Sequence, residues 1–348
     1  SDELQVEWQK DVFPDSSWQS ATPPVFADLS IVPGAGGALV GFRVTGSTPP
    51  PLPPIGFTHD VTQNLDLSGN LKWPTARYAF AASAPIPAPP ATRVATSDAL
   101  AITTWPAGTS SNFTWHTVKY DALGGSVFDL QLPLLDYTTP AVGPCVSASD
   151  GSGGAFYSYA RVNASGNTEL VAARVTASGN IFYLAPIATA PGVCEQIRPL
   201  KMLSHPASNA VILVYRDLAE IQCCRFSDSN GISNVWGPSF VRSATTASPD
   251  FDAADIVFSV GSVVIGTTTS ASDDFLMKRL RSSTGFPLWS PTTRVINHRG
   301  GIKPCEPHLF TKSNSSYGSV ICMWSHTDAA GYDYTTHAES LTYTGVPG

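Results

Sequence analysis

The chain has 348 residues, a formal net charge of −7 and only 14% charged residues, while 43% of its residues are hydrophobic. This charge excludes nucleic acid as a partner, because phosphate binding needs a basic surface, and no apolar run of about 18 residues exists to insert into a membrane. The 28 glycines and 29 prolines favour short strands and turns over helices.

A turn followed by an apolar strand recurs along the chain. One copy reads Gly36-Gly37-Ala38-Leu39-Val40, and another reads Gly318-Ser319-Val320-Ile321-Cys322. The copies are spaced by about 62, 55, 55, 52 and 57 residues, which is within reach of the propeller-repeat range. Their anchor positions are Gly37, Ala99, Gly154, Asn209, Gly261 and Gly318.

A turn glycine with an aromatic residue shortly after it recurs at the same period. The pairs are Gly69 with Trp73, Gly125 with Phe128, Gly179 with Phe182, Gly231 with Trp236, and Gly285 with Trp289. Further apolar strands precede and separate these two markers, so each unit of roughly 50 residues holds four short strands. The alternative, a run of β-sandwich domains, needs about 100 residues for each domain and fits this period poorly.

We therefore expect an all-β fold, a single six-bladed β-propeller over residues 1–348 with four-stranded blades. The blades are expected at approximately 20–75, 90–130, 140–185, 195–238, 247–290 and 302–348. The segment Leu4-Gln5-Val6-Glu7-Trp8 alternates like a strand. We expect residues 1–12 to supply the outer strand of the last blade, which would close the ring and remove exposed sheet edges.

Residues 150–217 resemble the blade repeat of secreted bacterial-type β-propeller repeat proteins, DGxGGAxxxWxDxR…GNxxIxAQRxxxxGxxLW. The matching segments are Asp150-Gly151-Ser152-Gly153-Gly154-Ala155, Ser165-Gly166-Asn167 and Ala172-Ala173-Arg174. Tyr159 and Tyr215 stand where that repeat has tryptophan, and its glutamine is absent. The resemblance implies a propeller fold and an extracellular setting, but no defined chemistry.

Three N-x-S/T sequons, at Asn112, Asn163 and Asn314, fall where we expect turns or strand ends, which suits N-glycosylation. Together with an even number of cysteines they favour a secreted or extracellular surface protein.

The six cysteines lack C-x₂-C spacing, so a zinc knuckle is not indicated. Cys305 and Cys322 would face each other across a hairpin, and Cys145 and Cys194 could join neighbouring blades. The adjacent pair Cys223 and Cys224 permits either a strained vicinal bridge or two free thiols pointing to opposite faces.

Catalytic and metal motifs are missing from the sequence. No H-E-x-x-H, G-x-S-x-G or calcium loop occurs, so no metal and no cofactor is expected. The nearest match to the sialidase turn S-x-D-x-G-x-T-W lies at 227–233 and is out of register. Glycosidase carboxylates would come from Asp28, Asp252 or Glu306. We therefore expect the chain not to be an enzyme.

These observations favour an extracellular or cell-surface propeller that acts as a binding or assembly module, such as a glycosylated subunit of a surface layer or filament. Its partners would be other surface proteins or copies of itself, or glycans. A lectin is the alternative, and Trp115 is the candidate ligand-facing aromatic side chain. A glycoside hydrolase or a sialidase-like enzyme is the second alternative.

Overall fold

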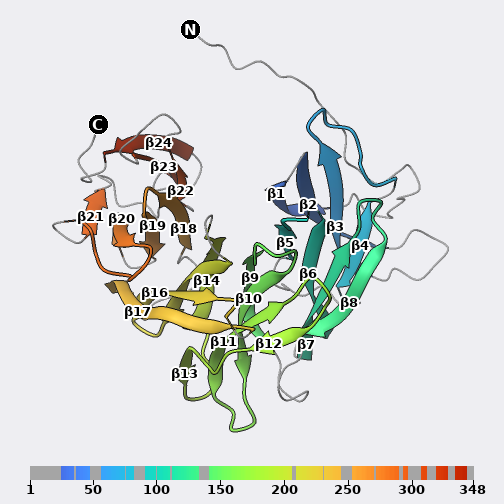
Figure 1. Cartoon of the computed structure of the whole chain (residues 1–348), viewed down its shortest axis with the longest axis horizontal. Coiled ribbons are helices and arrows are strands. Elements are labelled where there is room, and N and C mark those ends of the chain that lie inside the picture. Colours follow the sequence, from blue (N-terminus) through green and yellow to red (C-terminus); the bar gives the residue numbers. More distant parts are fainter. Residues whose placement is uncertain are drawn as a thin grey trace. The chain divides into compact units, whose positions relative to one another are not determined.

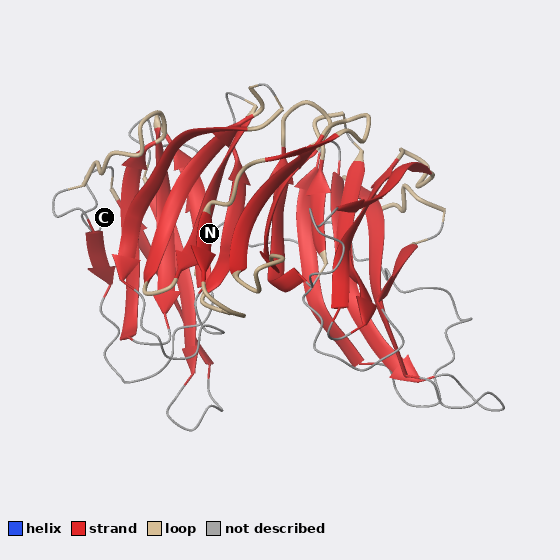
Figure 2. Ribbon diagram, turned by 90° about the horizontal axis from the view of Figure 1, so that it is seen from below, coloured by secondary structure: helices blue, strands red, loops and turns tan. Residues whose placement is uncertain are grey.

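The computed structural model is built from strands and connecting loops, and the described residues contain no helix (Figure 2). It describes residues 25–34, 37–47, 56–74, 76–81, 91–98, 100–109, 112–132, 141–205, 209–229, 231–243, 253–269, 272–289, 293–296, 307–311, 319–327 and 334–342. Across these ranges, no helix long and apolar enough to cross a membrane is found.

The first three sheets use strands β1 to β13 (Figure 1). Sheet 1 contains β1 (Val25–Gly34), β2 (Gly37–Ser47), β3 (Gly56–Asp66) and β4 (Arg77–Ala81). Sheet 2 contains β5 (Thr92–Ala95), β6 (Ala101–Thr109), β7 (Asn112–Tyr120) and β8 (Ser126–Leu132). Sheet 3 contains β9 (Ala141–Ser149), β10 (Ala155–Val162), β11 (Thr168–Val175), β12 (Ile181–Tyr183) and β13 (Ala188–Ala190).

The last three sheets use strands β14 to β24. Sheet 4 contains β14 (Ile197–Ser204), β15 (Ala210–Asp217), β16 (Glu220–Ser227) and β17 (Ser233–Ser243). Sheet 5 contains β18 (Ala253–Ser259), β19 (Ser262–Thr269), β20 (Ser272–Arg281) and β21 (Thr293–Ile296). Sheet 6 contains β22 (His308–Thr311), β23 (Val320–Thr327) and β24 (Tyr334–Leu341).

Each sheet is an antiparallel meander whose hydrogen-bonded neighbours are also neighbours in the chain, with β13 as an extra partner of β11. This is the plan of propeller blades, and the fold is all-β and propeller-like. The predicted closing strand, residues 1–12, lies outside the described residues. Six blades in a closed ring therefore stay a prediction.

The chain divides into two units. The first comprises residues 1–157, 161–165 and 173–182, and the second comprises 158–160, 166–172 and 183–348. In β15, seven consecutive residues are buried, which is typical of a strand covered on both faces.

The cores lie between successive sheets. In the first unit, Leu39 of sheet 1 packs with Trp105 and Val118 of sheet 2, and Trp73 joins this cluster. In the second unit, side chains of β15 and β16 pack against β18 and β19, and Trp289 packs with sheet 6 side chains. Trp73 and Trp289, two aromatic residues of the repeat marker, therefore pack between neighbouring sheets.

A capped turn recurs where one strand reverses into the next. The Asp66 carboxylate accepts hydrogen bonds from the backbone N–H groups of Ser68 and Asn70, both at 2.8 Å. Asp121 caps its turn in the same way, with N–H groups of Leu123 and Gly125 at 2.8 and 2.7 Å. Such caps supply acceptors for turn N–H groups that the strands leave unpaired.

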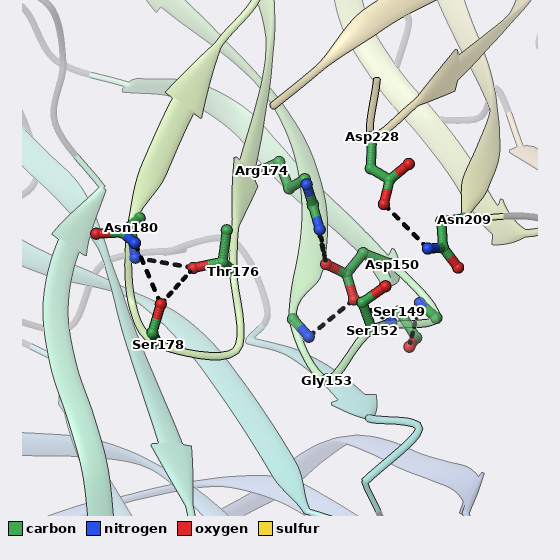
Figure 3. Close-up of polar contacts among 12 residues, drawn as sticks. Ser149, Asp150, Ser152, Gly153, Arg174, Thr176, Ser178, Asn180, Asn209 and Asp228 are labelled. Carbon is green, nitrogen blue, oxygen red and sulfur yellow. Dashed lines mark hydrogen bonds and ion pairs between the residues drawn. The ribbon is translucent and has the colours of Figure 1, made fainter. Parts of the chain in front are cut away.

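The same cap occurs at Asp150, which accepts N–H groups of Ser152 and Gly154, each at 2.8 Å (Figure 3). Its second carboxylate oxygen is buried and accepts a hydrogen bond from Nε of Arg174, in the next hairpin of sheet 3, at 2.9 Å. A terminal guanidinium nitrogen of Arg174 forms an ion pair with the same oxygen at 2.8 Å. One aspartate thus caps one turn and fixes the strand beside it through a charge-assisted contact.

Candidate functional site

Trp115 is not a ligand-facing side chain, and that prediction is wrong. Its indole is 1% exposed. Strand alternation explains the burial, because Trp115, Thr117 and Lys119 share one face of β7, and Thr117 bonds to the buried Tyr157 hydroxyl at 2.9 Å. The candidate ligand-facing side chain therefore lies in the interior of the fold.

The described cysteines are free thiols in this structure: Cys145, Cys194, Cys223, Cys224 and Cys322. The predicted bridge between Cys145 and Cys194 and the vicinal bridge are thus not formed in it. The alternative for the vicinal pair, two free thiols, is the arrangement seen, and both thiols are buried. Burial raises the pKa of the Cys223 and Cys224 thiols well above the ordinary value. Cys305 lies outside the described residues.

The sequons fall at different places. Asn163 is partly exposed on the hairpin between β10 and β11, and its side-chain oxygen accepts the N–H of Ser165 at 3.0 Å. Asn112 begins β7, opposite Thr109. Asn314 lies outside the described residues. N-glycosylation at these positions stays a prediction.

Of the carboxylates that we predicted for a glycosidase, only Asp28 falls within the described residues. Asp28 lies in β1, whereas Asp252 and Glu306 are outside the described part of the chain. In the same described ranges, no group of three or more His, Cys, Asp or Glu side chains is arranged to hold a metal ion.

Large apolar side chains are exposed where the third strand of a sheet turns into the fourth. In the first unit these are Leu67 and Leu71 in sheet 1, Leu123 and Val127 in sheet 2, and Phe182 in sheet 3. Leu67 is 74% exposed and Leu123 is 72% exposed. We call these five side chains the apolar rim.

Contacts between neighbouring sheets hold the rim together. Arg77 of sheet 1 donates to the backbone oxygen of Leu123 in sheet 2 at 3.4 Å. The turn glycine of sheet 3, Gly179, lies so close to sheet 2 that a β-carbon there would meet Phe128 at 3.5 Å. The rim is therefore one surface built by three successive turns.

The second unit repeats the pattern at the same place in its own sheets. Val235 of sheet 4 and Phe286 of sheet 5 are exposed at the equivalent turns. Single exposed apolar residues are ordinary, but a large apolar side chain at the same turn of five sheets is not scattered. In each unit taken by itself, these turns form an apolar surface suited to contact with another molecule.

Two carboxylates oppose each other on a tight hairpin of sheet 4. Asp217 ends β15 and Glu220 begins β16, and the two residues pair across the strands. Between them, Leu218 adopts a left-handed backbone conformation with φ of 51°, which is unusual for a residue that is not glycine. The hairpin is anchored because the Arg216 side chain donates to the Leu218 oxygen at 3.0 Å.

Two further polar side chains on the same face connect to this pair. Gln222 donates to a Glu220 carboxylate oxygen at 2.9 Å, and the Tyr215 hydroxyl lies 3.4 Å from the Gln222 side-chain oxygen. Tyr215 is buried, whereas Glu220 is exposed. The connected side chains therefore extend from the buried Tyr215 to the solvent-exposed Glu220.

Burial, together with the nearby Glu220 carboxylate, raises the pKa of Asp217 above its ordinary value. Burial also raises the pKa of Tyr215, so its hydroxyl stays protonated. A carboxyl group whose pKa is raised by burial and by a second carboxyl group is an arrangement that acid–base chemistry can use.

Neither the apolar rim nor the hairpin that carries Asp217 and Glu220 was predicted from the sequence. The rim residues flank the turn glycines on either side at the repeat period, so the second marker already indicated their position. The hairpin had a weaker signal in Asp217-Leu218-Ala219-Glu220, two carboxylates separated by the two residues of a tight turn.

No family model matches the chain, and no curated protein matches its sequence. Solved structures resemble it at low identity. The hemagglutinin-neuraminidase ectodomain of parainfluenza virus 5 has 7% identity and a TM-score of 0.48, covering 93% of this chain and 83% of that one. An α-L-arabinanase of Penicillium chrysogenum, solved with arabinobiose, has 10% identity and a TM-score of 0.40, covering 72% and 83%.

The SapL1 lectin, solved with α-methyl fucoside, has 11% identity and a TM-score of 0.40, covering 74% of this chain and 79% of that one. The prediction that this chain is not an enzyme is wrong, because the structures that resemble it include a neuraminidase and an arabinanase. At these TM-scores the likeness assigns neither a reaction nor a ligand to this chain.

Proposed function

We propose that this chain is an extracellular or cell-surface propeller that acts as a binding and assembly module. In this proposal, copies of the chain associate with one another through the apolar rim. The observation that carries it is the recurrence of exposed leucine, valine and phenylalanine side chains at one turn of successive sheets. Burying apolar area of this kind contributes roughly 25 cal/mol per Å² to association.

The net charge of the chain favours an uncharged contact surface between copies. The chain has a net charge of −7, so copies repel one another at long range. An apolar surface lets them associate without placing like charges against each other. The sequons support the extracellular setting in this proposal. The resemblance to secreted propeller repeats supports the same setting and membership of that family.

Sedimentation velocity on a dilution series tests the proposal. We expect the wild-type chain to form oligomers that dissociate on dilution, and the double variant Leu67→Ser/Leu123→Ser to sediment as a monomer. Val193→Ser is the matched control, because Val193 is a similarly exposed apolar side chain that does not belong to the rim. A monomeric wild type, or oligomers that persist in the double variant, would overturn the proposal.

A further inference from the structure

We propose that a polar seam between sheets 1 and 2 binds a neutral oligosaccharide. The seam consists of six side chains that lie where the two sheets meet: Trp73, Arg77, Trp105, His116, Tyr120 and Asp129. None of these belongs to the apolar rim, so this proposal and self-association through the rim can each fail without the other.

Strand alternation places the polar side chains on one face of sheet 2. His116, Val118 and Tyr120 share a face of β7, and Val118 and Tyr120 pack with Trp73, so this face meets sheet 1. Asp129 of β8 is the strand partner of Val118 and therefore lies on the same face. Tyr120 and His116 are four residues apart, so the seam extends for roughly 13 Å along β7.

Aromatic rings form the inner side of the seam. The ring centroids of Trp73 and Tyr120 are 5.2 Å apart, and those of Trp105 and His116 are 5.0 Å apart. Trp73, Trp105 and Tyr120 are buried, so their rings are fixed by the packing between the two sheets. Small-molecule sites commonly combine such aromatic side chains with a few polar groups that fix the orientation of the ligand.

Polar groups form the side of the seam that reaches solvent. Nε2 of His116 lies 3.1 Å from Oδ1 of Asp129, and the two side chains are 29% and 58% exposed. Arg77 is partly exposed and donates to the Leu123 backbone oxygen at 3.4 Å, and in the described part of the chain it forms no ion pair. A guanidinium, a carboxylate and an imidazole are thus accessible along one line.

Three buried nitrogen atoms of the seam have no hydrogen-bond partner among the described residues: Nε1 of Trp73, Nε of Arg77 and Nδ1 of His116. Trp73 as a whole is 0% exposed. Leaving a buried polar group unpaired is costly, so such groups call for a partner, and here they are gathered at one interface. A hydroxyl group suits both kinds of site, because it donates one hydrogen bond and accepts others.

The charges of the seam select the class of ligand. The Arg77 guanidinium donates hydrogen bonds and the Asp129 carboxylate accepts them, so the ligand must offer both acceptors and donors. An anionic ligand would meet the charge of Asp129, and a cationic ligand would meet that of Arg77. A neutral molecule that carries several hydroxyl groups on an apolar ring satisfies these conditions, and the extended line of polar groups suits more than one sugar unit.

The test applies the full chain to an array of neutral and acidic glycans and then measures the dissociation constant of the best neutral oligosaccharide by calorimetry. We expect retention on neutral glycans. Asp129→Asn and Arg77→Gln should each weaken binding about 10- to 100-fold, which is the effect of losing a hydrogen bond to a charged group. Glu220→Gln and Arg281→Gln, which change exposed side chains of sheets 4 and 5, are the matched controls and should bind like wild type.

A folding measurement separates loss of binding from loss of structure. Thermal unfolding of Asp129→Asn should match that of wild type, because the substitution keeps the shape of a side chain that is mostly exposed. Retention of no neutral glycan, or retention of acidic glycans alone, would overturn the proposal. Wild-type affinity in the Asp129→Asn variant would overturn it as well, even where Arg77→Gln fails to fold.

Discussion

The ammonium of Lys119 lies 2.6 Å from the backbone oxygen of Gly153, so a side chain of sheet 2 holds the first hairpin turn of sheet 3. The same ammonium contacts the Asp98 carboxylate at 2.6 Å, although Lys119 is only 2% exposed at its side chain. A buried cation is tolerated when it is paired and hydrogen-bonded, and here both conditions are met.

Lys119→Met should therefore destabilise the first unit. The substitution keeps the apolar stem and removes two charge-assisted hydrogen bonds, so we expect a loss of about 2–4 kcal/mol in the free energy of unfolding. Lys72→Met, which changes a partly exposed lysine of sheet 1, should stay within about 0.5 kcal/mol of wild type. Urea unfolding followed by tryptophan fluorescence measures both, and equal stability of the two variants would contradict the assignment.

Lys119 connects sheet 2 to the sheet that follows it, whereas Arg93 connects sheet 2 to the preceding sheet, sheet 1. Its guanidinium donates to the Thr62 hydroxyl at 2.8 Å, the Ser30 hydroxyl at 2.9 Å and the Val61 oxygen at 3.1 Å. It crosses directly over Gly41, where a β-carbon would lie 1.8 Å from the arginine Nε. The glycine thus provides the space that the buried arginine occupies.

Gly41→Ala should be strongly destabilising, by about 3 kcal/mol or more, because the added methyl group displaces Arg93 from its partners. In the background of Arg93→Ala, the same Gly41→Ala change should cost less than about 1 kcal/mol. This non-additivity is the signature of two residues in contact, and a double-mutant cycle in urea measures it. Additive effects of the two substitutions would show that Gly41 does not act by making room for Arg93.

The turn cap at Asp66 should titrate at an unusually low pH. Hydrogen bonds from the Asn70 backbone and side chain lower the Asp66 pKa below the ordinary value of 3.8. Because the folded pKa is the lower one, the stabilisation is present above the unfolded pKa and is lost as the pH falls through the folded pKa. Carbon-13 NMR of the Asp66 carboxyl measures this, and Asn70→Ala should reverse only part of the shift, since the N–H remains. A titration at the ordinary value would contradict the cap.

Asn163 should carry an N-linked glycan when the chain is secreted from a glycosylating host. The residue lies on an exposed hairpin, and its side chain is turned toward the Ser165 N–H at 3.0 Å. Ser165→Thr should keep the modification, whereas Ser165→Ala and Asn163→Gln should both lose it. Mass spectrometry before and after peptide N-glycosidase treatment reads this out. An unmodified Asn163 in the wild-type chain would contradict the prediction.

The sheets could be predicted because two local signals agree. A turn glycine such as Gly69 is needed where φ is positive, here 76°, and it is followed by a run whose apolar residues must be buried. Both signals come from residues that are close together in the chain, so they can be recognised in a single sequence.

Contacts between sheets could not be predicted in this way. The partner of Lys119 is the backbone oxygen of Gly153, and any residue supplies such an oxygen. The burial of Trp115 likewise depends on which face of β7 meets the next sheet. The Asp217–Glu220 pairing needed the hairpin register, which a one-residue slip would reverse.

Electron microscopy of the native, untagged protein at its source tests most directly whether the chain is an assembly module. We expect ordered assemblies whose copies touch through the turns that carry Leu67, Leu123 and Phe182. The Leu67→Ser/Leu123→Ser variant should not form these assemblies. Native material that consists of single, separate particles at all concentrations, or assemblies that leave these turns free, would contradict it.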